Sequence, residues 1–319
     1  MTLSLLGREI VRHRSPICYS LNMRNPLKHK KTIPFWLLGI TAAAYGAALG
    51  YLYARQDKLV FQPSVKHPLR HLFMEKYGER AREYAIEGEA VLKGWWVDAV
   101  DESDTVVIYF GGNAENIDTV IFLASNIPEV TMVSMHYRGY GMSEGKPSET
   151  GLFADALRIV DHVSAAHPDK RIVLFGRSLG SGVALYAAAK RPGLVEHVIL
   201  TTPYDSISRV AKRHYGWVPV HALLRHKFDS LVSAPHVVAP TTIIVASKDE
   251  YIPEEHPRNL AKALVNTSVT WHEVEEADHT TIHDWNQTWR YVRAALLRGP
   301  STVPAPLQAD AAPVISSNT

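Results

Sequence analysis

Short apolar runs alternate along most of the chain with longer segments in which apolar residues recur at helical spacing. The apolar runs, which predict strands, cover residues 105–110, 131–135, 172–175, 197–200, 241–246 and 268–274. Helices are predicted over residues 115–125, 151–166, 181–190, 256–265 and about 282–297. Uninterrupted apolar strands that alternate with helices are typical of a parallel sheet covered on both faces. The pattern therefore predicts an α/β fold with a mostly parallel central sheet flanked by helices.

The segments outside this alternation have other patterns. Residues 83–88 and 91–97 predict a hairpin of exposed strands. Residues 299–319, rich in Pro, Ala and Ser, have the composition of a disordered tail. Residues 32–54 carry no charge, and a helix of this length crosses a hydrocarbon layer of about 30 Å. A buried core helix and a cleaved signal peptide are the alternatives for this last segment.

Basic residues dominate the segment before the uncharged stretch. Residues 1–31 contain Arg8, Arg12, Arg14, Arg24, Lys28, Lys30 and Lys31 but only one acid, Glu9. Met23 is an alternative start. Because basic flanks stay in the cytoplasm, we expect an uncleaved, single-pass signal anchor with its N-terminus cytoplasmic. The rest of the chain would then be periplasmic or lumenal, where the sequons at 266–268 and 286–288 become relevant if the cell is eukaryotic.

Composition excludes several classes of protein. Lys and Arg number 34 against 32 Asp and Glu, a net charge of +2, so a nucleic-acid partner is not expected. Cys18 is the single cysteine, which excludes a disulfide framework and a cysteine-based metal site. The histidines show no metal-ligand spacing. We therefore expect no metal and no cofactor.

A Gly-x-Ser-x-Gly motif lies between the predicted strand 172–175 and the helix 181–190. It reads Gly176-Arg177-Ser178-Leu179-Gly180. A serine on a sharp turn between a strand and a helix is the setting of a nucleophile elbow, and the turn is so tight that the flanking positions require glycine. The alternative is a glycine-rich turn in which the serine has no chemical role.

An acid and a histidine follow the motif at the ends of later strands. Asp249 comes just after strand 241–246, with Glu250 as its competitor, and it would orient an imidazole. His279 follows strand 268–274 and would act as the base. His283 is the rival, but it falls in the last predicted helix, where it could face solvent. The order Ser, Asp, His along the chain is the hydrolase order.

The loop after strand 105–110 supplies candidate oxyanion donors. It reads Gly111-Gly112-Asn113, and the backbone amide of Asn113 is the first candidate. The amide of Leu179, directly after the nucleophile, is the second. A simple glycine turn is the alternative for this loop.

With these motifs the chain resembles the α/β-hydrolase superfamily, and more narrowly the signal-anchored serine hydrolases of the α/β-hydrolase-domain type, some of which remove fatty acyl groups from proteins. Gly111 stands where that family usually has His, and Ala246 where it often has Gly. The resemblance implies that Ser178, His279 and Asp249 are nucleophile, base and orienting acid. The matching segments are 55–63, 109–114, 137–145, 176–180, 227–230, 249–253 and 278–279.

In this fold, the stretch at about 207–240 is expected to be a cap over an acyl site. Its candidate apolar lining is Trp217, Val218, Val220, Leu223 and Leu224, unless these residues only pack the cap against the sheet. The expected domains are a basic N-terminus (1–31), an anchor (32–54), a hydrolase domain (55–298) and a tail (299–319). We expect a membrane-bound esterase or thioesterase acting on acyl or lipid-like substrates, with a peptidase or a non-catalytic membrane-tethered interaction protein as alternatives.

Overall fold

The computed structural model describes residues 35–63, 71, 74–75 and 78–297. The expected basic N-terminus and C-terminal tail lie outside these residues. The chain divides into two units, residues 1–47 and 48–319. The first helix, α1 (Phe35–Val60), has 26 residues and continues beyond the predicted end of the anchor at Ala54. Among the described residues it is the one helix long and apolar enough to cross a membrane.

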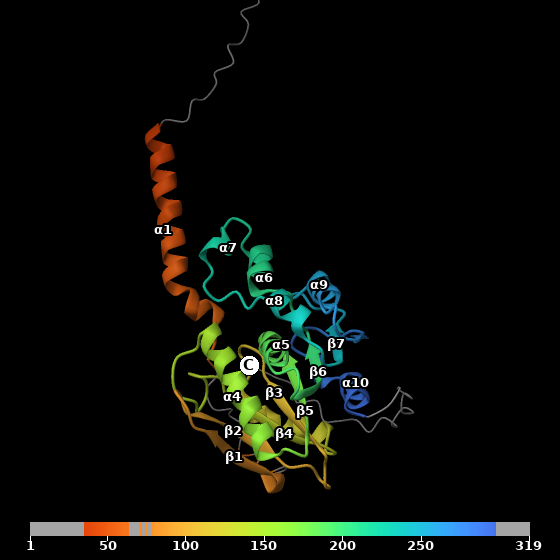
Figure 1. Cartoon of the computed structure of the whole chain (residues 1–319). Helices are drawn as coiled ribbons and strands as arrows, with labels where there is room; N and C mark the ends of the chain where they lie inside the picture. Colours follow the sequence, from red (N-terminus) through yellow and green to blue (C-terminus); the bar gives the residue numbers. More distant parts are fainter. Residues whose placement is uncertain (1–34, 64–70, 72–73, 76–77, 298–319) are drawn as a thin grey trace, which may run out of the picture. The chain divides into compact units, whose positions relative to one another are not determined.

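The second unit is built on an eight-stranded sheet in the order β1-β2-β4-β3-β5-β6-β7-β8 (Figure 1). β1 and β2 run antiparallel to their neighbours, and all later pairs are parallel. The strands are β1 (Ala81–Ile86), β2 (Leu92–Val97), β3 (Thr105–Phe110), β4 (Thr131–Met135), β5 (Arg171–Arg177), β6 (Val195–Thr201), β7 (Thr241–Ala246) and β8 (Val269–Val274). The predicted α/β class with a mostly parallel sheet is confirmed.

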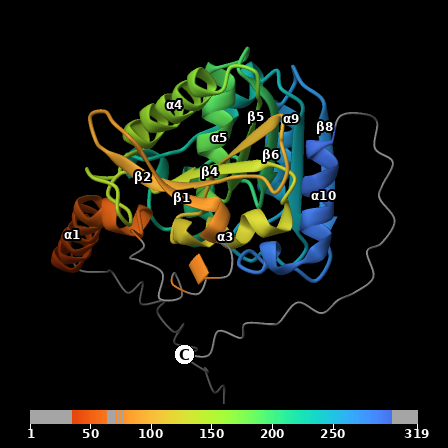
Figure 2. The ribbon, with the colours of Figure 1, turned by 90° about the horizontal axis from the view of Figure 1, so that it is seen from below.

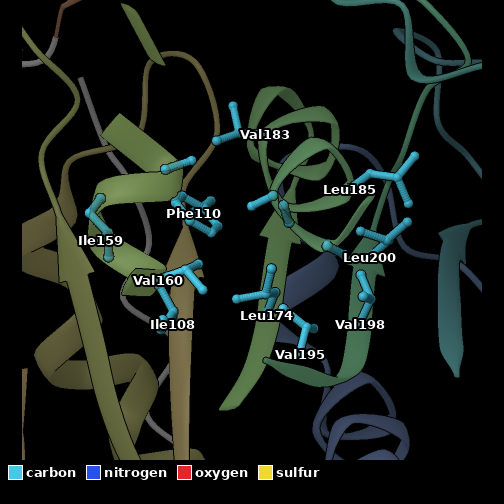
Figure 3. Packing of buried hydrophobic residues seen from close by; sticks show 14 of the residues in the cluster. Ile108, Phe110, Ile159, Val160, Leu174, Val183, Leu185, Val195, Val198 and Leu200 are labelled. Atoms are coloured by element: carbon cyan, nitrogen blue, oxygen red, sulfur yellow. The ribbon is translucent and has the colours of Figure 1, made fainter. Parts of the chain in front are cut away.

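Helices cover both faces of the sheet (Figure 2). One face packs against α4 (Glu149–Ala166), α5 (Leu179–Lys190) and α9 (Glu255–Ala263). The other packs against α3 (Val120–Leu123) and α10 (Asn286–Leu296). Figure 3 shows how Ile108, Leu174 and Val198 of three adjacent strands meet the apolar sides of α4 and α5. This packing fixes the carboxyl ends of the strands, where active groups of such sheets lie.

Two predictions about local structure are wrong. β2 is not exposed, because it pairs with β4 as well as with β1, and Trp95 and Trp96 are buried on its opposite faces. The predicted helix 115–125 is three short pieces: a 3₁₀ turn (Ile117–Thr119), α3 and a second 3₁₀ turn (Ala124–Asn126). The side chain of Asn116 accepts from the amide of Asp118 and caps the first turn, which therefore begins at Ile117 and not at residue 115.

The segment between β6 and β7 consists of short helices joined by irregular loops. It contains α6 (Ile207–His214), α7 (Val220–Leu223), α8 (Ser230–Ser233) and a 3₁₀ turn (Ala234–His236). Ser206 caps α6 by accepting from the amide of Arg209. The short bridge between Ser206 and Asp229 closes the segment at its base. We call residues 207–228 the cap segment.

Candidate active site

The turn between β5 and α5 holds Ser178 in a conformation that few residues adopt. Its φ and ψ are 48° and −118°, in a region that side chains normally avoid. A Cβ at Gly176 would lie 2.4 Å from the carbonyl oxygen of Gly180. A Cβ at Gly180 would lie 2.0 Å from the carbonyl oxygen of Phe110. Strain at a single non-glycine residue that neighbouring elements hold in place is typical of functional sites.

A line of hydrogen bonds connects Ser178 with the two other predicted residues. The hydroxyl of Ser178 lies 3.0 Å from Nε2 of His279, and Nδ1 of His279 lies 2.8 Å from Oδ2 of Asp249. With a proton on Nδ1 donated to Asp249, Nε2 is free to accept from Ser178. The other oxygen of Asp249 accepts from the amides of Tyr251 and Ile252, which fixes the carboxylate. Its competitor Glu250 is exposed.

His283, the alternative base, occupies a different place from the one expected. It is not exposed but buried in a 3₁₀ turn (Ile282–Asp284), where Nε2 lies 3.1 Å from the hydroxyl of Thr201. Burial, and next the charge of Arg177, hold the pKa of His283 well below its usual value. His283 is buried because its ring lies against Phe175 and Trp289 in the core.

Two residues of the loop after β3, Gly112 and Asn113, make hydrogen bonds that hold the loop in place. The amide of Gly112 donates to Oε2 of Glu115 at 2.7 Å. The side chain of Asn113 accepts from the hydroxyl of Tyr140 at 2.8 Å and from the amide of Gln62 at 3.1 Å. Leu179 is the first residue of α5, and such amides have no partner within their own helix.

An ion pair joins the loop after β3 to the loop that carries His279. Arg177 lies inside the serine motif, and its NH1 contacts Oε2 of Glu115 at 3.1 Å. Its NH2 donates to the carbonyl oxygens of His279 and Thr280 at 3.1 and 3.0 Å. Burial disfavours the charge of Arg177, but Glu115 outweighs this effect and the pKa of Arg177 is raised. One guanidinium therefore positions two of the loops around Ser178.

A mainly apolar cavity of about 480 Å³ opens beside Ser178 and His279. This volume lies within the range of small-molecule sites. The cap segment contributes Val218, Val220, Leu223 and Leu224, as predicted, but not Trp217, which is 56% exposed. Trp217 lies on the turn between α6 and α7. Other lining residues come from α6, from the end of α1 and from the loop after β7.

Several residues around the site were not predicted. The sequence held a hint of Glu115 and Arg177, since an acid follows the Gly-Gly turn and an arginine lies inside the serine motif. Gln62 and Tyr140 carried none, because their bonds to Asn113 span 51 and 27 residues of the chain. Among the described residues, no group of three or more His, Cys, Asp or Glu side chains could hold a metal ion.

Comparisons with known proteins agree with this fold. A family profile described as alpha/beta hydrolase fold matches residues 105–225. An uncharacterized membrane protein of Saccharomyces cerevisiae is 28% identical over 273 residues, which cover 82% of this chain and 95% of that protein. The lysophosphatidylserine lipase ABHD12 of Macaca fascicularis is 29% identical over 188 residues, covering 52% of this chain and 47% of the lipase.

A solved structure of a bacterial membrane phospholipase A shares the same fold. It is 15% identical, with a TM-score of 0.57 over 83% of this chain and 98% of that one. The fold is that of an α/β hydrolase, and the chain is similar to proteins of the α/β-hydrolase superfamily.

Proposed function

We propose that the protein is a membrane-anchored serine hydrolase that cleaves carboxylic esters or thioesters of acyl chains. The observation that carries this proposal is the line of hydrogen bonds from Ser178 through His279 to Asp249 beside an apolar cavity. Lipase and phospholipase names among the similar proteins also support an ester substrate. An apolar cavity next to a nucleophile is suited to the acyl part of such a substrate.

The proposed reaction passes through an acyl-enzyme. The hydroxyl oxygen of Ser178 attacks the acyl carbonyl carbon while Nε2 of His279 takes the hydroxyl proton. The amides of Asn113 and Leu179 donate to the oxyanion. His279 then gives its proton to the leaving alcohol or thiol as the bond from carbon to oxygen or sulfur breaks. Asp249 stabilises the imidazolium that forms in between.

Water completes the cycle. His279 removes a proton from a water molecule, whose oxygen attacks the acyl carbon bound to Ser178. The proton returns to the oxygen of Ser178 as the carboxylic acid leaves, so the enzyme regains its starting state. The loss of one oxyanion donor in such a reaction typically costs about a hundredfold to a thousandfold in rate.

The proposed anchor is α1, with the N-terminus in the cytoplasm and the hydrolase domain on the other side of the membrane. Its length and the basic segment before it support this arrangement. In a eukaryotic host, a glycan on Asn266, which is exposed, would mark a lumenal domain. Expression of wild type and Asn266→Gln, with and without a glycosidase, tests the orientation. An unglycosylated wild type with protease-accessible domain in the cytosol contradicts it.

The catalytic assignment is tested by labelling with a fluorophosphonate probe. We expect the full chain in detergent to be labelled, Ser178→Ala to be unlabelled, and Ser125→Ala to label like the wild type. Turnover of matched ester, thioester and amide substrates then identifies the bond that is cleaved. Absence of labelling in the wild type contradicts a serine hydrolase, and turnover of amides alone indicates a peptidase.

A further inference from the structure

The end of α1 is part of the wall of the cavity. Its lining includes Leu52, Tyr53, Gln56, Leu59 and Val60, together with residues of the cap segment. All of them belong to the second unit of the chain, which begins at Ala48 and also contains the sheet and the cap segment. The cavity is therefore lined by the helix that would anchor the protein in the membrane, and not by the hydrolase core and cap alone.

A buried glutamine attaches this helix to the cap segment. Gln56 is the one buried residue of α1. Its Nε2 donates to the carbonyl oxygen of Leu223 at 3.2 Å, and its Oε1 accepts from the amide of Arg225 at 2.7 Å. The amide side chain thus makes a two-way contact with the backbone of the cap segment. A buried polar group of this kind is costly to leave unpaired, so it specifies the position of the helix.

Charged and aromatic contacts extend the attachment. Asp57 accepts from the side chain of Arg225 at 2.9 Å and lies 3.0 Å from Nε2 of His226. The guanidinium of Arg225 also lies over the ring of Tyr53, 5.2 Å from its centre. Arg225 and Asp57 are both partly exposed, so this pair adds less than the buried glutamine does.

The chain that follows α1 leads directly to the oxyanion loop. Phe61 is buried against Phe228 and His226. The next residue, Gln62, donates its amide to the side chain of Asn113 at 3.1 Å. The exit of the helix is therefore fixed at two points, the cap segment and the loop that carries a proposed oxyanion donor.

The length of α1 places this wall at the edge of a membrane. A helix of 26 residues is about 39 Å long, whereas about 20 residues cross a hydrocarbon layer of about 30 Å. Counted from Phe35, 20 residues end at Ala54. The residues that line the cavity begin at Leu52, so the cavity wall starts where the hydrocarbon layer ends.

We propose that residues Leu52–Val60 of α1 form an acyl-chain binding wall, so that the anchor helix also selects the chain length of the substrate. This proposal rests on the proposed function and names the ligand: the single acyl chain of an ester or thioester that resides in the membrane. The bound chain lies between the apolar side chains of α1 and those of α6 and α7. The carbonyl carbon then reaches Ser178, which also lines the cavity.

Substitutions that fill or enlarge the wall test this proposal in the full-length protein. Leu59→Trp narrows the cavity. We expect it to lower kcat/KM more for longer acyl chains: at least tenfold for a dodecanoyl ester and less for an acetyl ester. Leu59→Ala enlarges the cavity and is expected to move the preferred chain length upward. Leu194→Trp, the same change on an exposed turn outside the cavity, is the matched control.

The readouts separate this proposal from the proposed function. Labelling of Leu59→Trp by a small fluorophosphonate at the wild-type rate shows that the fold and nucleophile are intact. An acyl-length profile that neither Leu59→Trp nor Leu59→Ala changes, in enzyme that is still labelled, overturns the acyl-binding wall alone. Equal losses for all acyl lengths in both variants also overturn it. A wild-type protein that is not labelled overturns the proposed function instead.

Discussion

At the scale of single residues, the turn around Ser178 shows how little space the site has. The backbone of Gly180 approaches the carbonyl oxygens of Phe110 and Gly111 so closely that a methyl group has no room. Both contacts are with backbone atoms, which cannot rotate out of the way. The glycine thus serves close packing of α5 against β3, and the strain at Ser178 depends on that packing.

The first prediction concerns this glycine. Gly180→Ala should lower the free energy of unfolding by at least about 2 kcal/mol and abolish labelling of Ser178, because α5 must shift away from β3. Gly193→Ala is the control, since a Cβ there meets nothing within 4 Å. Thermal unfolding and fluorophosphonate labelling of both variants check the prediction. Equal stability of the two variants would show that the turn is not tightly packed.

A second buried acid and histidine form a pair that resembles the site without belonging to it. Asp205 follows β6, and its carboxylate accepts from His256 at 2.7 Å and from Asn259 at 3.1 Å. Burial opposes ionisation of Asp205, but these hydrogen bonds outweigh it and lower its pKa. The pair holds α9 against the end of β6, whereas Asp249 contacts His279.

The second prediction separates the two acids. Asp249→Asn should lower kcat about a thousandfold to ten-thousandfold with little change in melting temperature, because the imidazole loses its orienting charge. Asp205→Asn should destabilise the fold by about 3 kcal/mol, since its partners lose a buried charge, and leave kcat of the folded fraction within a few fold. Steady-state kinetics and thermal unfolding distinguish these outcomes. The reverse pattern would make Asp205 the orienting acid.

At the scale of secondary-structure elements, the site depends on loops that no single element controls. Arg177 ends β5, Glu115 lies in the loop after β3, and His279 follows β8. The hydroxyl of Tyr109 also donates to Glu115 at 2.7 Å, so the carboxylate is held from the strand below it. Burial, and next the charge of Glu115, raise the pKa of Tyr109 well above its usual value, which keeps it a donor.

The third prediction concerns this connection. Arg177→Gln should lower kcat about tenfold to a hundredfold and leave KM nearly unchanged, because both loops move relative to Ser178 while the cavity stays intact. Arg171→Gln, at the other end of β5, is a control that removes a charge away from the site. A rise in KM without loss of kcat would assign Arg177 to substrate binding instead of positioning.

At the scale of the whole molecule, partly or fully buried histidines make the folded state sensitive to acid. His167, His197, His272 and His283 all have a lowered pKa, and burial is the largest cause for each. For His197 the pKa falls to about 4, with the charge of Arg171 as the second cause. Its ring lies 2.9 Å from the hydroxyl of Thr242 in the neighbouring strand.

The fourth prediction follows from the sign of these shifts. Between pH of about 6.5 and 4, unfolded His197 binds a proton that folded His197 does not, so stability is present above this range and is lost as the pH falls through it. His197→Gln should flatten the dependence by up to about 1.4 kcal/mol per pH unit. His221→Gln, at an exposed position of α7, is the matched control. Urea unfolding in detergent at several pH values measures the slopes.

Much of the molecule was predictable because the relevant signals are local. The predicted runs of five or six residues matched β3, β4 and β7 at both ends, since strands buried on both faces carry no charged residues. The serine motif was predictable because a sharp turn between strand and helix excludes all but small residues at its flanks. The burial of β2 was not predictable, since it depends on pairing with β4, which lies far along the chain.

The sequence by itself determined the order of strands and helices, the long apolar segment of α1 and the candidate residues Ser178, His279 and Asp249, because each follows from spacing or from the end of a strand. Only the tertiary structure decided that Arg177 joins two loops, that His283 is buried, and that Trp217 lies outside the cavity. It also decided that the end of α1 lines that cavity. These features arise from contacts between segments up to 169 residues apart, such as Gln56 with Arg225, which no local pattern encodes.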